Sequence, residues 1–155
     1  MKKFKFRLEA VYKYRKELEK QAILEVERLR QEELKIANDI ERIRMQHQSW
    51  AGHYNEAGQT SNQADRVILI TQYLAALDLQ QRQREQDHKQ IIQIIGKAIE
   101  VVRQAYRARR QIEYLREKQW GEFQENVKKQ EARDLDQASS LRFAHQNMEE
   151  TVWSH

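Results

Sequence analysis

The chain has 155 residues, 34% charged and 39% hydrophobic, and its 28 basic residues nearly balance 24 acidic ones. Four glycines and no proline leave too few turn-forming residues for a compact sheet fold, and the absence of cysteine excludes disulfides and thiolate chemistry. This composition fits long helices with a narrow apolar stripe, and the charge balance and regular apolar spacing argue against disorder.

A first helix is expected over about residues 6–52. Its apolar positions step by three and four residues, which is the heptad pattern of a coiled coil. Two successive steps of four, at Leu18, Ala22 and Val26, predict a stutter that locally unwinds the supercoil. Such a helix cannot bury its own apolar stripe, so it needs a partner helix.

Turn-forming residues cluster only between Gly52 and Asp65, and residues 53–64 are therefore the expected tip of a hairpin. Thr60 and Gln63 have the spacing of a capping box at the start of a new helix.

A second helix is expected over about residues 65–148, with a seam that shifts after Ala105 to a track beginning at Tyr106. A turn near residue 59 would place Leu8 opposite Arg110, so that residues 113–155 overhang the first helix. The predicted fold is all-α: one domain, residues 1–155, forming a long antiparallel two-helix coiled-coil hairpin whose second helix overhangs at the C-terminus.

The run Val67–Leu79 is apolar around more of its circumference than a two-helix seam can cover. Either a further segment packs over it, or it is an exposed docking face. It is too short to span a bilayer, and residues 1–20 lack the features of a secretory signal, so we expect a soluble, cytoplasmic protein without direct membrane insertion.

Two segments are basic: residues 1–20 carry eight basic against three acidic residues, and residues 97–118 carry seven against three. The antiparallel register brings these segments together, which indicates an acidic partner, although a solvated surface with intrahelical pairs is the simpler interpretation. Acidic residues interrupt each basic run and no nucleic-acid motif is present, so no nucleic-acid partner is expected.

No motif of an active site is present: there is no glycine-rich phosphate loop, nucleophile elbow or metal-type ligand spacing. A two-helix rod also offers no concave pocket. We therefore expect no enzyme activity, no cofactor and no metal.

The N-terminal pattern Phe4-x-Phe6-x-Leu8-x-x-Val11, followed by Arg15 and a Glu-rich helix, resembles the start of the flagellar FliJ family. The series Ile70, Tyr73 and Leu77 is similar to the opening of that family's second helix. Residues 131–142 resemble its late L-D-E-x-A…R pattern, with Gln137 in place of the usual acidic residue.

The resemblance implies a non-enzymatic, stalk-like component of the flagellar type III export apparatus. Such a protein couples the hexameric export ATPase to the export-gate membrane protein, escorts export chaperones, and is cytoplasmic at the membrane face of the flagellar base. The candidate gate contacts implied by position are Ile70, Tyr73, Leu77 and Arg84. Some members of the family have histidine at the position of Arg84. The candidate ATPase contacts at the basic end are Phe4, Phe6, Arg7, Arg15, Arg103, Arg107, Arg109 and Arg110.

Other functions fit the same pattern. The chain could be the equivalent stalk of a virulence-type secretion system, or a self-associating structural tether whose tip is only a hinge. A basic helical nucleic-acid binder is a third interpretation, which a steep salt dependence of binding would support.

Overall fold

The computed structural model describes the backbone of residues 3–59 and 64–153, with side chains through Gln146. Helix α1 spans Glu9–Ala57 and helix α2 spans Ala64–Trp153, and the described residues contain no strand. The predicted all-α, two-helix hairpin is confirmed. The predicted capping residues Thr60 and Gln63 lie outside the described ranges.

Helix α1 ends five residues later than predicted, because Gly52 is not a break but an interior helical residue. The helix stops at Ala57, which is buried, and a tight turn follows in which the Gly58 amide donates to the Tyr54 carbonyl at 3.0 Å. A single glycine weakens a helix by only about 1 kcal/mol, which the packing of its apolar face outweighs.

The chain divides into two compact units. One unit, residues 16–106, contains α1 from residue 16 onward and the first half of α2. The other unit contains residues 1–15, with the first turns of α1, and residues 107–155. The sequence-based assignment of one domain remains a prediction.

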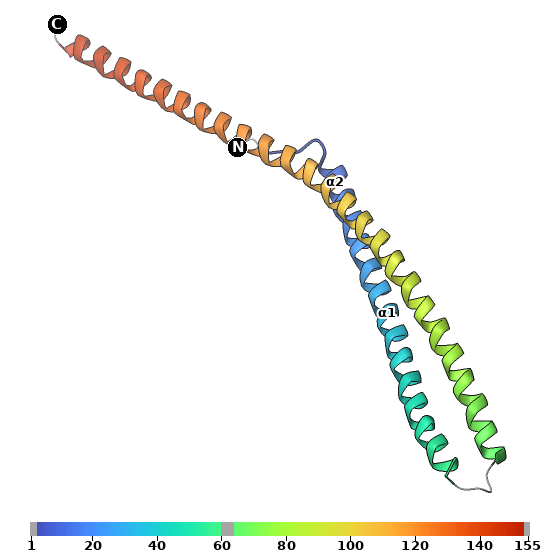
Figure 1. The fold of residues 1–155 in the computed structure, drawn as a ribbon. Coiled ribbons are helices and arrows are strands. Elements are labelled where there is room, and N and C mark those ends of the chain that lie inside the picture. The colour runs from blue at the N-terminus through green and yellow to red at the C-terminus, as the bar shows by residue number, and fades with distance from the viewer. Residues whose placement is uncertain (1–2, 60–63, 154–155) are drawn as a thin grey trace. The chain divides into compact units, whose positions relative to one another are not determined.

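Within residues 16–106 the two helices run antiparallel (Figure 1). Two histidine–carboxylate contacts between the helices define their register: His47 Nε2 lies 3.1 Å from Asp78 Oδ1, and His88 Nε2 lies 3.3 Å from Glu33 Oε1. These histidines lie half-buried along the seam, as their heptad positions predict.

The predicted pairing of Leu8 with Arg110 is wrong. Glu9 Oε2 instead lies 3.1 Å from Arg116 Nε, so α1 meets a later part of α2. The cause is the continuation of α1 past Gly52, which moves the turn later in the chain.

The seam of α1 is a regular heptad without the predicted stutter. Leu18 is exposed, and Glu19 takes the half-buried position between Arg15 and Ala22, so that steps of three and four alternate. The predicted shift on α2 is also absent. Tyr106 is exposed, and the seam continues without interruption through Arg109 and Ile112.

The seam is apolar in blocks separated by polar layers. Leu29, Ile91 and Ile95 form a buried cluster in residues 16–106, and Ile36, Ala98 and Ile99 pack against it. Nearer the tip, Ile43, Ala57, Ile70 and Leu77 are buried. On α2, half-buried polar side chains lie between these blocks, namely Gln81, Glu85 and His88. The hairpin therefore has a narrow, discontinuous core.

In the unit of residues 1–15 and 107–155, the N-terminal segment packs along α2. The Phe4 ring meets the Trp120 ring edge-on at 5.0 Å and the Phe123 ring at 5.6 Å between centroids, and Phe6 is buried. The predicted overhang from residue 113 therefore begins later, since the half-buried Val127 is the last seam residue and residues 128–146 are all exposed.

Candidate interaction surfaces

The predicted gate contacts separate into two buried and two exposed residues. Ile70 and Leu77 each keep only 3% of their surface exposed, because both face α1 in the seam. Tyr73 is exposed and its ring lies 5.2 Å from that of Trp50 on α1. A partner that docks on the closed hairpin can therefore touch Tyr73 but not the other two apolar residues.

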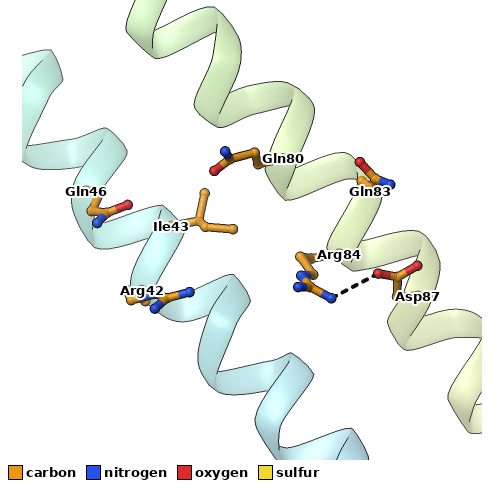
Figure 2. A pocket seen from close by; sticks show the side chains of 7 residues that line it. All are labelled: Arg42, Ile43, Gln46, Gln80, Gln83, Arg84 and Asp87. Carbon is orange, nitrogen blue, oxygen red and sulfur yellow. Dashed lines mark hydrogen bonds and ion pairs between the residues drawn. The ribbon is translucent and has the colours of Figure 1, made fainter.

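Arg84, the fourth predicted gate contact, lies beside a polar groove between the helices (Figure 2). Its guanidinium is 3.2 Å from Asp87 Oδ2 and 3.8 Å from Asp39 Oδ2. Ile43 points into the space between the helices, and polar side chains surround it: Arg42, Gln46, Gln80, Gln83 and Asp87. Asp39 and Asp87 already neutralise the charge of Arg84. The groove can therefore offer a partner hydrogen bonds but not an unpaired positive charge.

An apolar face lies on the side of α2 away from the seam, just after the tip. Ile68, Leu69 and Leu79 are exposed there, Leu79 at 68%. Ala75 and Ala76 continue the same face at helical spacing and are also exposed. No segment of the described chain covers it, so of the two interpretations of Val67–Leu79 the structure favours an exposed face.

The predicted ATPase contacts of residues 1–15 are partly structural. Phe4 packs onto Trp120 and Phe123 of α2, which makes it an anchor of the N-terminal segment, and Phe6 is buried. Arg15 Nη1 donates a hydrogen bond to the Ala108 carbonyl oxygen at 2.8 Å, and Arg7 is exposed.

The predicted arginines of α2 differ in how far acidic neighbours neutralise them. Arg109 and Arg110 each place Nη1 2.7 Å from the same Glu113 oxygen. The hydrogen bond from Arg110 is the main cause that lowers the pKa of the Glu113 carboxyl below its ordinary value of 4.5. Arg107 is exposed, and Arg103, in residues 16–106, lies 3.4 Å from Glu100. The unit of residues 1–15 and 107–155 thus brings Arg7, Arg15, Arg107, Arg109 and Arg110 together, but only part of that charge is free.

Three α2 residues that anchor the N-terminus were not identified from the sequence: Arg116, Trp120 and Phe123. Arg116 pairs with Glu9 and its guanidinium lies 5.4 Å from the Tyr12 ring centroid. The aromatic residues at helical spacing, Trp120 and Phe123, were the signal that could have paired them with the N-terminal phenylalanines.

The described residues contain no group of three or more histidine, aspartate or glutamate side chains arranged to hold a metal ion. Nor does any helix within them combine the length and apolar character needed to cross a bilayer. The surfaces described above are helix faces and grooves between helices, which suit contacts with other proteins.

The profile of a family described as Flagellar FliJ protein matches residues 4–148, nearly the whole chain. The chain belongs to the FliJ family. No curated protein and no solved structure matches it. FliJ membership makes this a coiled-coil protein of flagellar export, from a family of non-catalytic proteins associated with the export apparatus.

Proposed function

We propose that this FliJ protein couples the hexameric flagellar export ATPase to the export-gate membrane protein and escorts export chaperones. It would act in the cytoplasm at the flagellar base, without catalysis and without a cofactor. The family match supports the flagellar system over a virulence-type one. The observation that carries the proposal is an exposed apolar face directly after the tip of a paired hairpin.

The apolar face supports gate binding because a cluster of large exposed apolar side chains on a protein of this composition indicates a protein contact. Ile68, Leu69, Tyr73 and Leu79 are the exposed large apolar residues after the tip, and they are the side chains proposed to touch the gate. Arg84 lies about one further turn along α2 and would supply a polar contact at the edge. Ile70 and Leu77 support this surface from beneath by fixing α2 against α1.

The basic residues of the unit of residues 1–15 and 107–155 support ATPase binding by that unit. Arg7 and Arg107 are the exposed members without a carboxylate within ion-pair distance in the described chain, so we propose them as the main electrostatic contacts. Phe4 and Phe6 would act indirectly, by holding the N-terminal segment against α2. Charge complementarity of this kind mainly speeds association.

A first experiment mixes the purified chain with the cognate export ATPase and measures hydrolysis and hexamer formation. Stimulation of both is expected, and Arg107→Glu should weaken binding by about tenfold through repulsion from an acidic partner surface. Lys35→Glu makes the same charge change on an exposed part of α1 in the other unit and should leave binding unchanged. Absence of both binding and stimulation at micromolar concentrations would exclude the ATPase role.

A second experiment tests the gate contact with Leu79→Asp. Binding to the cytoplasmic part of the gate should fall by about tenfold or more, because a charge is placed in an apolar contact. Leu135→Asp is the matched control, since Leu135 is similarly exposed on the distant part of α2. Equal loss of binding in the two variants, or none in either, would contradict the proposed gate surface.

A further inference from the structure

A second apolar surface lies along one flank of the hairpin in residues 16–106. Two neighbouring hollows between α1 and α2 share Arg30; Leu34 and Ile92 line one, and Ile23 and Ile99 line the other. Leu34 is 56% exposed, and Ile23 and Ile92 are nearly as open. On α1 these residues each follow a seam position by one, so they share one flank of the helix. We call this surface the flank groove.

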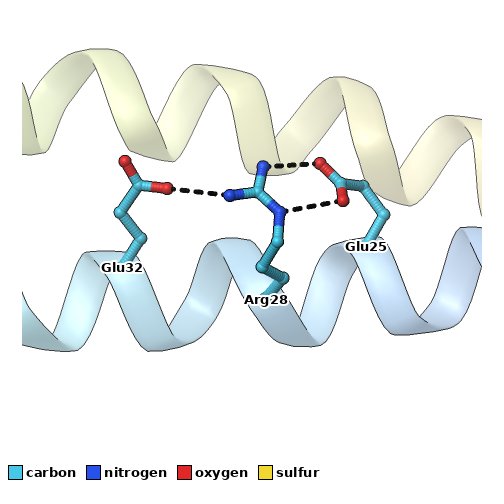
Figure 3. A network of polar contacts seen from close by, with 3 residues as sticks. All are labelled: Glu25, Arg28 and Glu32. Carbon is cyan, nitrogen blue, oxygen red and sulfur yellow. Dashed lines mark hydrogen bonds and ion pairs between the residues drawn. The ribbon is translucent and has the colours of Figure 1, made fainter.

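The other flank of α1 has the opposite character. Glu25, Arg28 and Glu32 each precede a seam position by one, and they form a continuous ion-paired network (Figure 3). Arg28 donates to Glu25 through Nη2 at 2.7 Å and Nε at 2.9 Å, and reaches Glu32 Oε2 at 3.4 Å. Between residues 25 and 32 that flank of α1 therefore presents charged side chains, whereas the flank groove presents Ile23 and Leu34 on either side of Glu27 and Arg30.

Gly96 lies on the flank groove between Ile92 and Ile99, at helical spacing from both. A Cβ atom there would meet nothing within 4 Å, so the packing of the hairpin itself does not require glycine. Glycine in a helix interior lowers stability, whereas it allows another backbone to approach closely. The open space at Gly96 therefore leaves room for a helix from outside the hairpin to approach closely.

We propose that the flank groove binds a second copy of this chain, antiparallel to the first. The reason is that the residues of the groove are placed symmetrically about one point on each helix. On α1, Ile23 and Leu34 are equidistant from the Arg28–Leu29 peptide bond, and so are Glu27 and Arg30. A two-fold axis across the hairpin at this level places Ile23 against Leu34 of the second copy and Glu27 against its Arg30. An isologous contact requires this self-complementarity of a surface.

The α2 half of the groove has the same centre. Ile92 and Ile99 are equidistant from the Ile95–Gly96 peptide bond, and Ile95 shares a buried cluster with Leu29, so the two centres lie at one level of the hairpin. The same axis thus places Ile92 against Ile99 of the second copy and Gly96 beside the axis, where the two α2 helices come closest. The result is an antiparallel four-helix arrangement.

The charges of the groove agree with this occupant. Neither Glu27 nor Arg30 takes part in an ion pair within the described chain, in contrast to the paired flank around Arg28. Farther out on the same flank, Lys16 and Glu41 are also equidistant from the centre and complementary in charge. The interface is short and its two halves are shallow, so the dimer should be weak, with a dissociation constant of about 1–100 µM.

Cysteine cross-linking tests the contact and its register, because the native chain has no cysteine. The variant Ile23→Cys/Leu34→Cys cannot close a disulfide within one chain, since eleven residues of helix separate the two sulfurs by about 16 Å. Mild oxidation should give a covalent dimer, and a mixture of the two single variants should give more dimer than either alone. Leu24→Cys/Lys35→Cys has the same spacing away from the groove and is the control. Dimer yields no higher than this control would overturn the proposal.

Sedimentation of the full chain tests the association without cross-linking. The native chain should form a dimer as concentration rises to about 0.1 mM. Glu27→Arg or Arg30→Glu should each weaken it by about tenfold, and the double exchange Glu27→Arg/Arg30→Glu should restore it. Gly96→Leu should abolish the dimer while leaving the far-UV circular dichroism unchanged. A native chain that stays monomeric at this concentration would overturn the proposal, and so would a double exchange that fails to recover association. The inference is independent of the proposed ATPase and gate contacts, which the experiments above test separately.

Discussion

Two leucines two residues apart on α2 give opposite predictions. Leu77 keeps 3% of its surface exposed and Leu79 keeps 68%. Truncating a buried leucine to alanine removes its transfer free energy and leaves a cavity, a loss of about 2–5 kcal/mol. We expect about 3 kcal/mol for Leu77→Ala, because the seam of two helices can collapse partly around the gap. For Leu79→Ala we expect a change within about 0.5 kcal/mol.

The measurement is urea unfolding followed by circular dichroism at 222 nm, with hydrogen exchange to locate the effect. A hairpin with a discontinuous core is marginally stable, so the loss at Leu77 should open the tip-proximal part first and raise exchange there. Leu77→Asp should lower helicity as well, because it places a charge in the buried seam. Equal unfolding midpoints for the two alanine variants would refute the assignment of Leu77 to the core.

Three further predictions follow from local contacts. Gly52→Ala should stabilise the hairpin by about 1 kcal/mol in thermal unfolding, because Gly52 is helical and a Cβ there meets nothing within 4 Å; destabilisation would show that the glycine is needed. Phe4→Ala should release the N-terminal segment through loss of the ring contact with Trp120 at 5.0 Å, seen as faster tryptic cleavage after Lys5; unchanged cleavage would argue against this anchor. The pKa of Glu113, followed by NMR titration, should rise toward 4.5 in Arg110→Gln. Because the folded-state pKa is lowered, this carboxylate stabilises the fold above that ordinary value, and the contribution is lost as pH falls through the lowered pKa; the same pKa in both proteins would remove Arg110 as its cause.

The periodicity of apolar residues was sufficient to predict the two helices and their antiparallel pairing. Steps of three and four residues place Leu29, Ile43 and Ile95 on apolar stripes whose exposure to water is unfavourable. Only a partner helix can bury such a stripe. The same spacing places His47 and His88 on the seam, where the structure has them half-buried. Local spacing carries this information because it follows from the geometry of one helix.

The register could not be obtained in this way, because it depends on where the turn forms. Gly52 marks a weak point in α1, but the packing of the residues around it holds the helix to Ala57, and each later pairing moves with the turn. The same limit led to the predicted stutter at Leu18. Leu18 was predicted to lie on the seam because it is apolar. In the structure Glu19 holds the seam position instead, because the spacing of seam positions along the paired helices is regular.

The sequence by itself determined the class of protein: helical composition, heptad spacing and the phenylalanine pattern at the N-terminus were enough to indicate a FliJ-type hairpin. Tertiary structure alone decided which apolar residues of Val67–Leu79 are available to a partner. Leu77 and Leu79 have the same chemistry and lie almost side by side in sequence, yet a helix turns about 200° between them. One faces α1 and the other faces solvent, because only the position of the second helix determines which side of α2 is covered.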